Sequence, residues 1–157
     1  MEGRYTIFDV AAWFLKKEHM THKRLQKLCY YAYAWDLAIR NGKLIKNCSF
    51  EAWVHGPVNR ELYQMLKGNK LRELSIVDIT VATVDITDPD DVDFLESVWA
   101  TYGKYGANSL EILTHREAPW KNARAGYSPF DSCSNVISID DMKNYYSSIY
   151  IGSEDSL

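Results

Sequence analysis

The chain has 157 residues, of which 46% are hydrophobic and 25% are charged, and its formal net charge is −3 at pH 7. These values are typical of a globular protein with one hydrophobic core, and they exclude a strongly basic chain that binds nucleic acid through its overall charge. The three cysteines form no Cys-x-x-Cys pair, and the N-terminal residues contain no apolar signal core. No stretch approaches about 18 consecutive apolar residues, so we expect a cytoplasmic protein without a membrane span.

The N-terminal part of the sequence predicts two helices. Thr6, with Asp9 three residues later, is typical of a helix start, and apolar residues then recur at helical spacing. Thr21 is suited to cap a second helix, which is expected to end at Asn41 and Gly42. This second helix is apolar on nearly all sides, which places it at the centre of the fold.

The middle of the chain predicts a small β element and a short helix. Residues 50–55 are expected to be extended and to lead into a turn at Gly56 and Pro57, after which Asn59 is suited to cap a helix. In residues 76–87 apolar and polar side chains alternate, which predicts one or two short strands.

Further helix signals follow towards the C-terminus. Asp88 and Pro89, with acidic residues behind them, are a strong helix start. Pro119 separates two shorter helical segments, and Ser138 is suited to cap the last helix.

These signals together predict a mainly α fold with about six or seven helices. The small β element is expected at residues 50–55 and 76–87. We expect residues 1–150 to form a single compact domain and residues 151–157 to form a mobile tail.

The sequence contains no recognisable catalytic set. It has no nucleophile elbow and no glycine-rich phosphate loop, and its histidines are not accompanied by a cysteine pair. We therefore expect no metal, no cofactor and no enzymatic activity. One alternative is a hydrolase in which His55 and His115 act as an acid–base pair.

Aromatic and basic residues are instead concentrated in three segments, which suits a protein-binding surface. The candidate partner-binding residues are Lys23, Arg24, Lys27, Trp53, His55, Pro57, Arg116, Trp120 and Arg124. Among them Lys27 and Arg124 are predicted to belong to the more exposed group. Arg124 follows Trp120 by four residues, so its guanidinium is expected to stack on the indole or to bind a carboxylate.

A second alternative is a DNA-binding regulator. The first helix, the short joint at residues 18–21 and the basic start of the second helix loosely resemble a helix-turn-helix. The second helix is, however, too aromatic to lie in a groove with both sides exposed, so nucleic acid is an unlikely partner.

Three ordered segments resemble the Panacea domain, also called the SocA-like or phage-associated GepA-like domain. They are Leu25-Gln26-Lys27-Leu28-Cys29-Tyr30-Tyr31, Phe50-Glu51-Ala52 with Gly56-Pro57-Val58, and Thr114-His115 with Pro119-Trp120 and Arg124. The resemblance covers about residues 6–126. The matching motif residues are Leu25, Lys27, Leu28, Tyr30, Tyr31, Gly56, Pro57, Val58, His115, Pro119, Trp120 and Arg124.

This resemblance implies an antitoxin of a toxin–antitoxin module, often phage-borne, that neutralises a cognate protein toxin by direct contact. It leaves open whether the chain also binds a second copy of itself or delivers the toxin to a protease. It also implies that the three motif segments lie close together in the fold.

Overall fold

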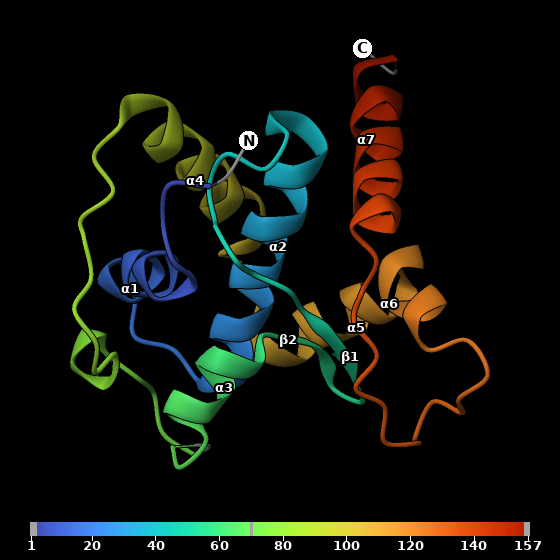
Figure 1. Cartoon of the computed structure of the whole chain (residues 1–157), viewed down its shortest axis with the longest axis horizontal. Helices are drawn as coiled ribbons and strands as arrows, with labels where there is room; N and C mark the ends of the chain where they lie inside the picture. Colours follow the sequence, from blue (N-terminus) through green and yellow to red (C-terminus); the bar gives the residue numbers. More distant parts are fainter. Residues whose placement is uncertain (1–2, 70, 156–157) are drawn as a thin grey trace.

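The computed structural model describes residues 3–69 and 71–155, with side chains as far as Tyr150. This part of the chain contains seven α-helices, one short β-hairpin and one 3-10 helix (Figure 1). The elements are α1 (Ile7–Lys17), α2 (His22–Arg40), β1 (Glu51–Trp53), β2 (Gly56–Val58), α3 (Arg60–Leu66), η1 (Ile76–Asp78), α4 (Pro89–Tyr102), α5 (Ala107–Arg116), α6 (Ala118–Ala123) and α7 (Ile139–Asp155). The predicted mainly α fold is confirmed.

Helix α2 is the central element of the protein. It packs against α1, α4, α5 and α7, and every residue from Leu25 to Ala34 is buried. Figure 1 shows α2 between α1 and α4 on one side and α7 on the other. The apolar pattern on all sides of this helix therefore predicted its position correctly, because a helix surrounded by others buries its whole circumference.

Local capping chemistry sets the helix boundaries. Thr6 and Asp9 form a reciprocal capping box at the start of α1, and the Thr21 hydroxyl accepts from the backbone of α2. Helix α2 ends at Asn41, which is in the left-handed conformation with φ 60°, and Gly42 follows with φ 78°. These boundaries depend on neighbouring residues alone, which is why the sequence predicts them well.

The β element at residues 50–55 is confirmed and forms one arm of a hairpin. β1 pairs antiparallel with β2, and Trp53 lies opposite Gly56 across the turn. The other edge of β1 is covered by the segment before α7, because Ala52 N donates to Asn135 O at 2.8 Å. The chain therefore brings residues near 135 back beside the hairpin.

The predicted strand at residues 76–87 is wrong. Residues 76–78 form η1, and the described chain has no strand from there to α4. Val77 and Val84 are exposed, and Val84 N donates to the carboxylate of Asp9 at 2.8 Å instead of to a neighbouring strand. Only Ile79 and Ile86 are buried. The alternation therefore reflects two apolar anchors on an irregular segment, with no partner strand beside it.

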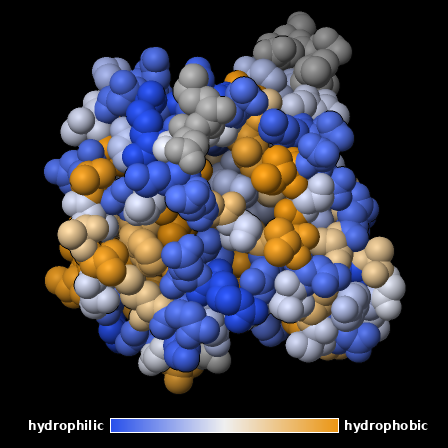
Figure 2. Space-filling model, in the orientation of Figure 1, coloured by the Kyte–Doolittle hydropathy of each residue, from blue (hydrophilic) through white to orange (hydrophobic). Residues whose placement is uncertain are grey.

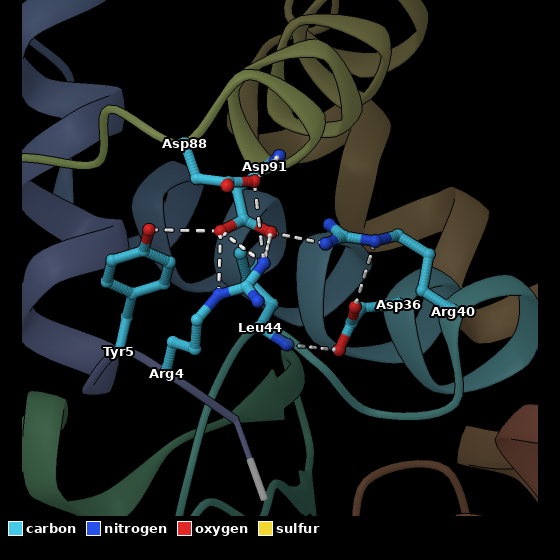
Figure 3. Close-up of polar contacts among 7 residues, drawn as sticks. All are labelled: Arg4, Tyr5, Asp36, Arg40, Leu44, Asp88 and Asp91. Atoms are coloured by element: carbon cyan, nitrogen blue, oxygen red, sulfur yellow. Dashed lines mark hydrogen bonds and ion pairs between the residues drawn. The ribbon is translucent and has the colours of Figure 1, made fainter. Parts of the chain in front are cut away.

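An ionic cluster around the buried Asp91 ties the N-terminal segment to α2 and α4 (Figure 3). The Asp91 carboxylate is fully buried and accepts from Arg4 Nη2 at 2.8 Å, from the Tyr5 hydroxyl at 3.0 Å and from Arg40. Burial acts to raise the pKa of Asp91, but the hydrogen bonds from Arg40 and Arg4 outweigh it and leave this pKa below its usual value. The carboxylate is thus held ionised inside the protein.

Helix α7 packs along α2 and extends to Asp155. Residues 156–157 of the expected tail lie outside the described residues, and the division at residue 150 stays a prediction. In the described part of the chain, none of the helices has the length and apolar character needed to cross a membrane.

Candidate partner-binding site

The three motif segments meet at one place, which we call the motif junction: the start of α2, the β1–β2 hairpin and the corner between α5 and α6. The Lys27 ammonium group donates to Pro57 O at 3.2 Å, and Trp120 Nε1 donates to Trp53 O at 2.8 Å. The side-chain amide of Gln26 both accepts from the backbone N–H of Asn59 and donates to its carbonyl. The predicted closeness of the three segments is therefore confirmed.

Glycine is required at position 56 because the hairpin lies directly on Lys27. Gly56 has φ +109°, and a Cβ built there would lie 2.6 Å from Lys27 Cε and 3.1 Å from Thr114 Oγ1. A side chain at this position would meet both strain in the backbone and a fully buried neighbour. The Gly-Pro-Val motif is thus explained by the close approach of the hairpin to α2.

Lys27 is a buried lysine whose side-chain nitrogen has one carbonyl partner in the motif junction. Burial is the main cause that lowers its pKa to about 7; the nearby Lys23 acts in the same direction, and Glu111 opposes the shift. Lysine is seldom buried to this degree unless it has a specific structural or chemical role.

The Trp120 side chain anchors the corner between α5 and α6. The imidazole of His115 stacks on it with ring centroids 4.0 Å apart, and the Arg124 guanidinium lies 5.0 Å from its ring centroid. Burial is the first cause that lowers the pKa of His115, so the ring favours its neutral form. The predicted stacking of Arg124 on Trp120 is confirmed.

Arg124 binds backbone carbonyls and no carboxylate among the described residues. Nη1 donates to Ala52 O at 2.8 Å, and Nη2 donates to Ser128 O at 3.0 Å and Asp131 O at 2.5 Å. This side chain therefore joins β1 to the loop that follows α6.

Glu117, which the sequence analysis did not single out, is the buried acid of this region. Its Oε1 accepts from the hydroxyls of Tyr31 and Tyr146, each at 2.8 Å, and the hydroxyls of Tyr146 and Tyr30 lie 3.1 Å apart. Burial raises the pKa of Glu117 to about 7, and the two tyrosine hydrogen bonds oppose the shift. The network connects the α5–α6 corner to α2 and α7.

The exposure of the candidates divides them into three groups. Lys27, Pro57, Trp120 and Arg124 are buried, Lys23, Arg24 and Trp53 are partly buried, and His55 and Arg116 are exposed. The expectation that Lys27 and Arg124 belong to the more exposed group is wrong. Their aliphatic stems and charged ends are enclosed because both donate to carbonyls of the hairpin. Every other motif residue is buried except His115, which is half-buried.

The outer face of the motif junction carries a small charged group. The Glu111 carboxylate pairs with Lys23 and lies 3.2 Å from His55 Nδ1. Arg116 follows on the same helix and is exposed. Arg24, by contrast, is turned to the end of α4, where its guanidinium donates to Gly103 O at 2.6 Å and Tyr105 O at 3.0 Å. Arg24 therefore serves largely to bind free carbonyls at the C-terminal end of α4.

The structure also bears on the two alternative functions, a DNA-binding regulator and a hydrolase that uses His55 and His115. A recognition helix must present a face to the major groove, but α2 is enclosed by four other helices. His115 is packed on Trp120, while His55 points to solvent with 74% of its side chain exposed. Among the described residues, no three His, Cys, Asp or Glu side chains gather as metal ligands would.

The fold and the motif junction define a compact, mainly helical protein in which the hairpin and the α5–α6 corner pack on a central helix. Residues 25–121, more than half of the chain, match the family model described as "Antitoxin SocA-like, Panacea domain". The chain belongs to this family, which is typically non-enzymatic. No curated protein matches it, and no solved structure does.

Proposed function

We propose that this chain is the antitoxin of a toxin–antitoxin module and that it neutralises a cytoplasmic protein toxin by direct binding, without catalysis. The observation that carries the proposal is the family match over residues 25–121, which coincides with the segments that build the motif junction. The family name indicates a protein partner.

The candidate contact surface is the outer face of the motif junction. His55 and Arg116 are exposed there, and Lys23 and Trp53 are partly exposed. The buried motif residues hold this surface in shape: Lys27 fixes the hairpin from below, and Trp120 fixes it from the side. An ordered surface binds with a smaller loss of conformational entropy than a mobile one.

The test is coexpression with the protein encoded by the adjacent reading frame. We expect that protein alone to stop growth, this chain to restore growth, and the two proteins to copurify. Neutralisation should require at least one antitoxin for each toxin, because toxin molecules in excess over the antitoxin stay unmasked and active. Full neutralisation at a tenfold shortage of antitoxin would indicate an enzyme or a recycled protease adaptor, and it would refute neutralisation by masking.

The residues of the surface are tested by charge reversal. Arg116→Glu and His55→Asp should weaken the complex, while Lys67→Glu, an exposed change at the end of α3, should not. If all three variants bind the toxin with the affinity of the wild type, the outer face of the motif junction does not belong to the interface.

A further inference from the structure

The loop between α6 and α7 has a defined shape although it buries almost nothing. We call residues 125–136 the anchored loop; Cys133 is its one buried residue. Its shape is fixed by hydrogen bonds: Ser128 N donates to the Asp131 carboxylate at 2.9 Å, and Asp131 N donates to Ser128 O at 3.1 Å. Asn135 closes its base through Ala123 O at 3.0 Å. A loop without core contacts usually stays mobile, so a fixed position requires a source of stabilisation other than the core.

That source is Arg124. Its buried guanidinium reaches two carbonyls inside the anchored loop, those of Ser128 and Asp131, and one carbonyl in β1, that of Ala52. Burying a cation without a carboxylate is costly, and the carbonyl hydrogen bonds and the Trp120 ring offset that cost. The arrangement stabilises the position of the loop against the hairpin, since the loop itself contributes little core.

The anchored loop displays a phenylalanine to solvent. Phe130 is 88% exposed and lies inside the turn closed by Ser128 and Asp131. Tyr127 and Val136 of the same loop are also exposed. In Figure 2 the lower right of the molecule, where the loop lies, is a mixture of hydrophilic and apolar residues and not one large apolar patch. A surface of this kind suits binding by a single projecting side chain that enters a pocket of the partner, more than binding by a flat apolar face.

The charges of the segment that carries Phe130 indicate the kind of partner. Residues 125–142 contain no Lys, Arg or His, and they contain three acidic residues, Asp131, Asp140 and Asp141. A negatively charged segment is complementary to a basic rim. We propose that, in the toxin complex inferred above, Phe130 enters an apolar pocket of the toxin whose rim carries basic side chains. This inference rests on the proposed function and adds the anchored loop to the interface.

The test measures binding of the purified protein to the adjacent-frame protein, inactivated where needed, by isothermal titration calorimetry. Phe130→Ala should weaken binding at least about 30-fold, as expected for a central aromatic anchor. Leu71→Ala, a fully exposed control in the segment after α3, should change it less than about threefold. Both variants should keep the wild-type melting temperature, because neither side chain is buried. Wild-type binding should weaken as salt rises, and Asp140→Asn should reduce this salt dependence.

The outcomes separate the two proposals. Tight wild-type binding with an equal affinity for Phe130→Ala overturns this inference and leaves the proposed function in place. Affinity independent of salt overturns the basic rim. A wild-type dimer that Phe130→Ala dissociates assigns the loop to self-association and overturns the toxin as its partner. No binding and no rescue by the wild type overturn the proposed function and this inference together.

Discussion

The ammonium group of Lys27 lies beneath the backbone of Pro57 and donates to its carbonyl at 3.2 Å, so the hairpin covers the one charged residue of the α2 core segment, Leu25 to Ala34. This contact leaves no room for a side chain at position 56. It also makes the surface of the hairpin dependent on the packing beneath it.

Gly56→Ala should therefore destabilise the protein by about 2–3 kcal/mol, from the positive φ and the contact with Lys27 Cε. The measurement is urea unfolding followed by circular dichroism. Gly68→Ala is the matched control: a Cβ there meets nothing within 4 Å, so its effect should stay within about 0.5 kcal/mol. Equal stabilities of the two variants would contradict the close packing at position 56.

Arg124→Ala should unfold the protein more readily and release the anchored loop. The three carbonyl contacts of Arg124 predict a large loss of stability, about 3 kcal/mol. Amide hydrogen exchange should speed up in residues 125–136. Arg116→Ala, an exposed change nearby, should leave both stability and exchange unchanged. Unaltered exchange in Arg124→Ala would show that the loop has another anchor.

Glu117 should make the protein less stable as pH rises from about 4.5 to about 7. Its carboxyl has a pKa of about 7 in the folded chain and the usual 4.5 when unfolded, so in this window the unfolded state loses its proton first. The unfolded state then binds fewer protons, and the free energy of unfolding falls, by at most about 3 kcal/mol from this group.

The measurement compares wild type with Glu117→Gln, which keeps an acceptor for Tyr31 and Tyr146 but does not titrate. The variant should gain stability relative to wild type between pH 5 and pH 8. If the free energies of unfolding of the two proteins differ by the same amount at pH 5 and pH 8, the raised pKa does not belong to Glu117.

Asp91→Asn should destabilise the protein by about 3 kcal/mol, because it removes the charge shared by Arg4 and Arg40. Asp90→Asn changes an exposed residue in the same turn of α4 and serves as the control. Since the folded pKa of Asp91 is lowered, its stabilisation is present above the ordinary aspartate value of 3.8 and is lost as pH falls through the folded value. Thermal melts of both variants and of the wild type at pH 7 and pH 3 measure the effect. A difference in melting temperature between Asp91→Asn and wild type that is the same at both pH values would contradict this prediction.

The sequence was sufficient for features that depend on nearby residues. Thr6 with Asp9, Thr21, and Asp88 with Pro89 all lie at helix starts in the structure, since a cap acts on the N–H groups of the next turn. The family motifs also indicated which distant segments meet.

Features set by tertiary contacts could not be found in the same way. Lys27 and Arg124 are of residue types that usually lie at the surface, and distant segments packed on them make them buried. Glu117 gave no local signal, because its partners Tyr31 and Tyr146 lie on other helices. The alternation around Val77 and Val84 predicted strands, but strands require a neighbour that this segment lacks.

The inward direction of the motif side chains divides the molecule into a scaffold and an exchangeable exterior. Gly56, Trp120 and Arg124 hold the hairpin and the loop from within, whereas His55, Arg116 and Phe130 contribute little to that support. Libraries that randomise the three outer positions should consequently yield folded proteins at high frequency. Such libraries would offer a route to redirect this chain from one target to another while its architecture stays intact.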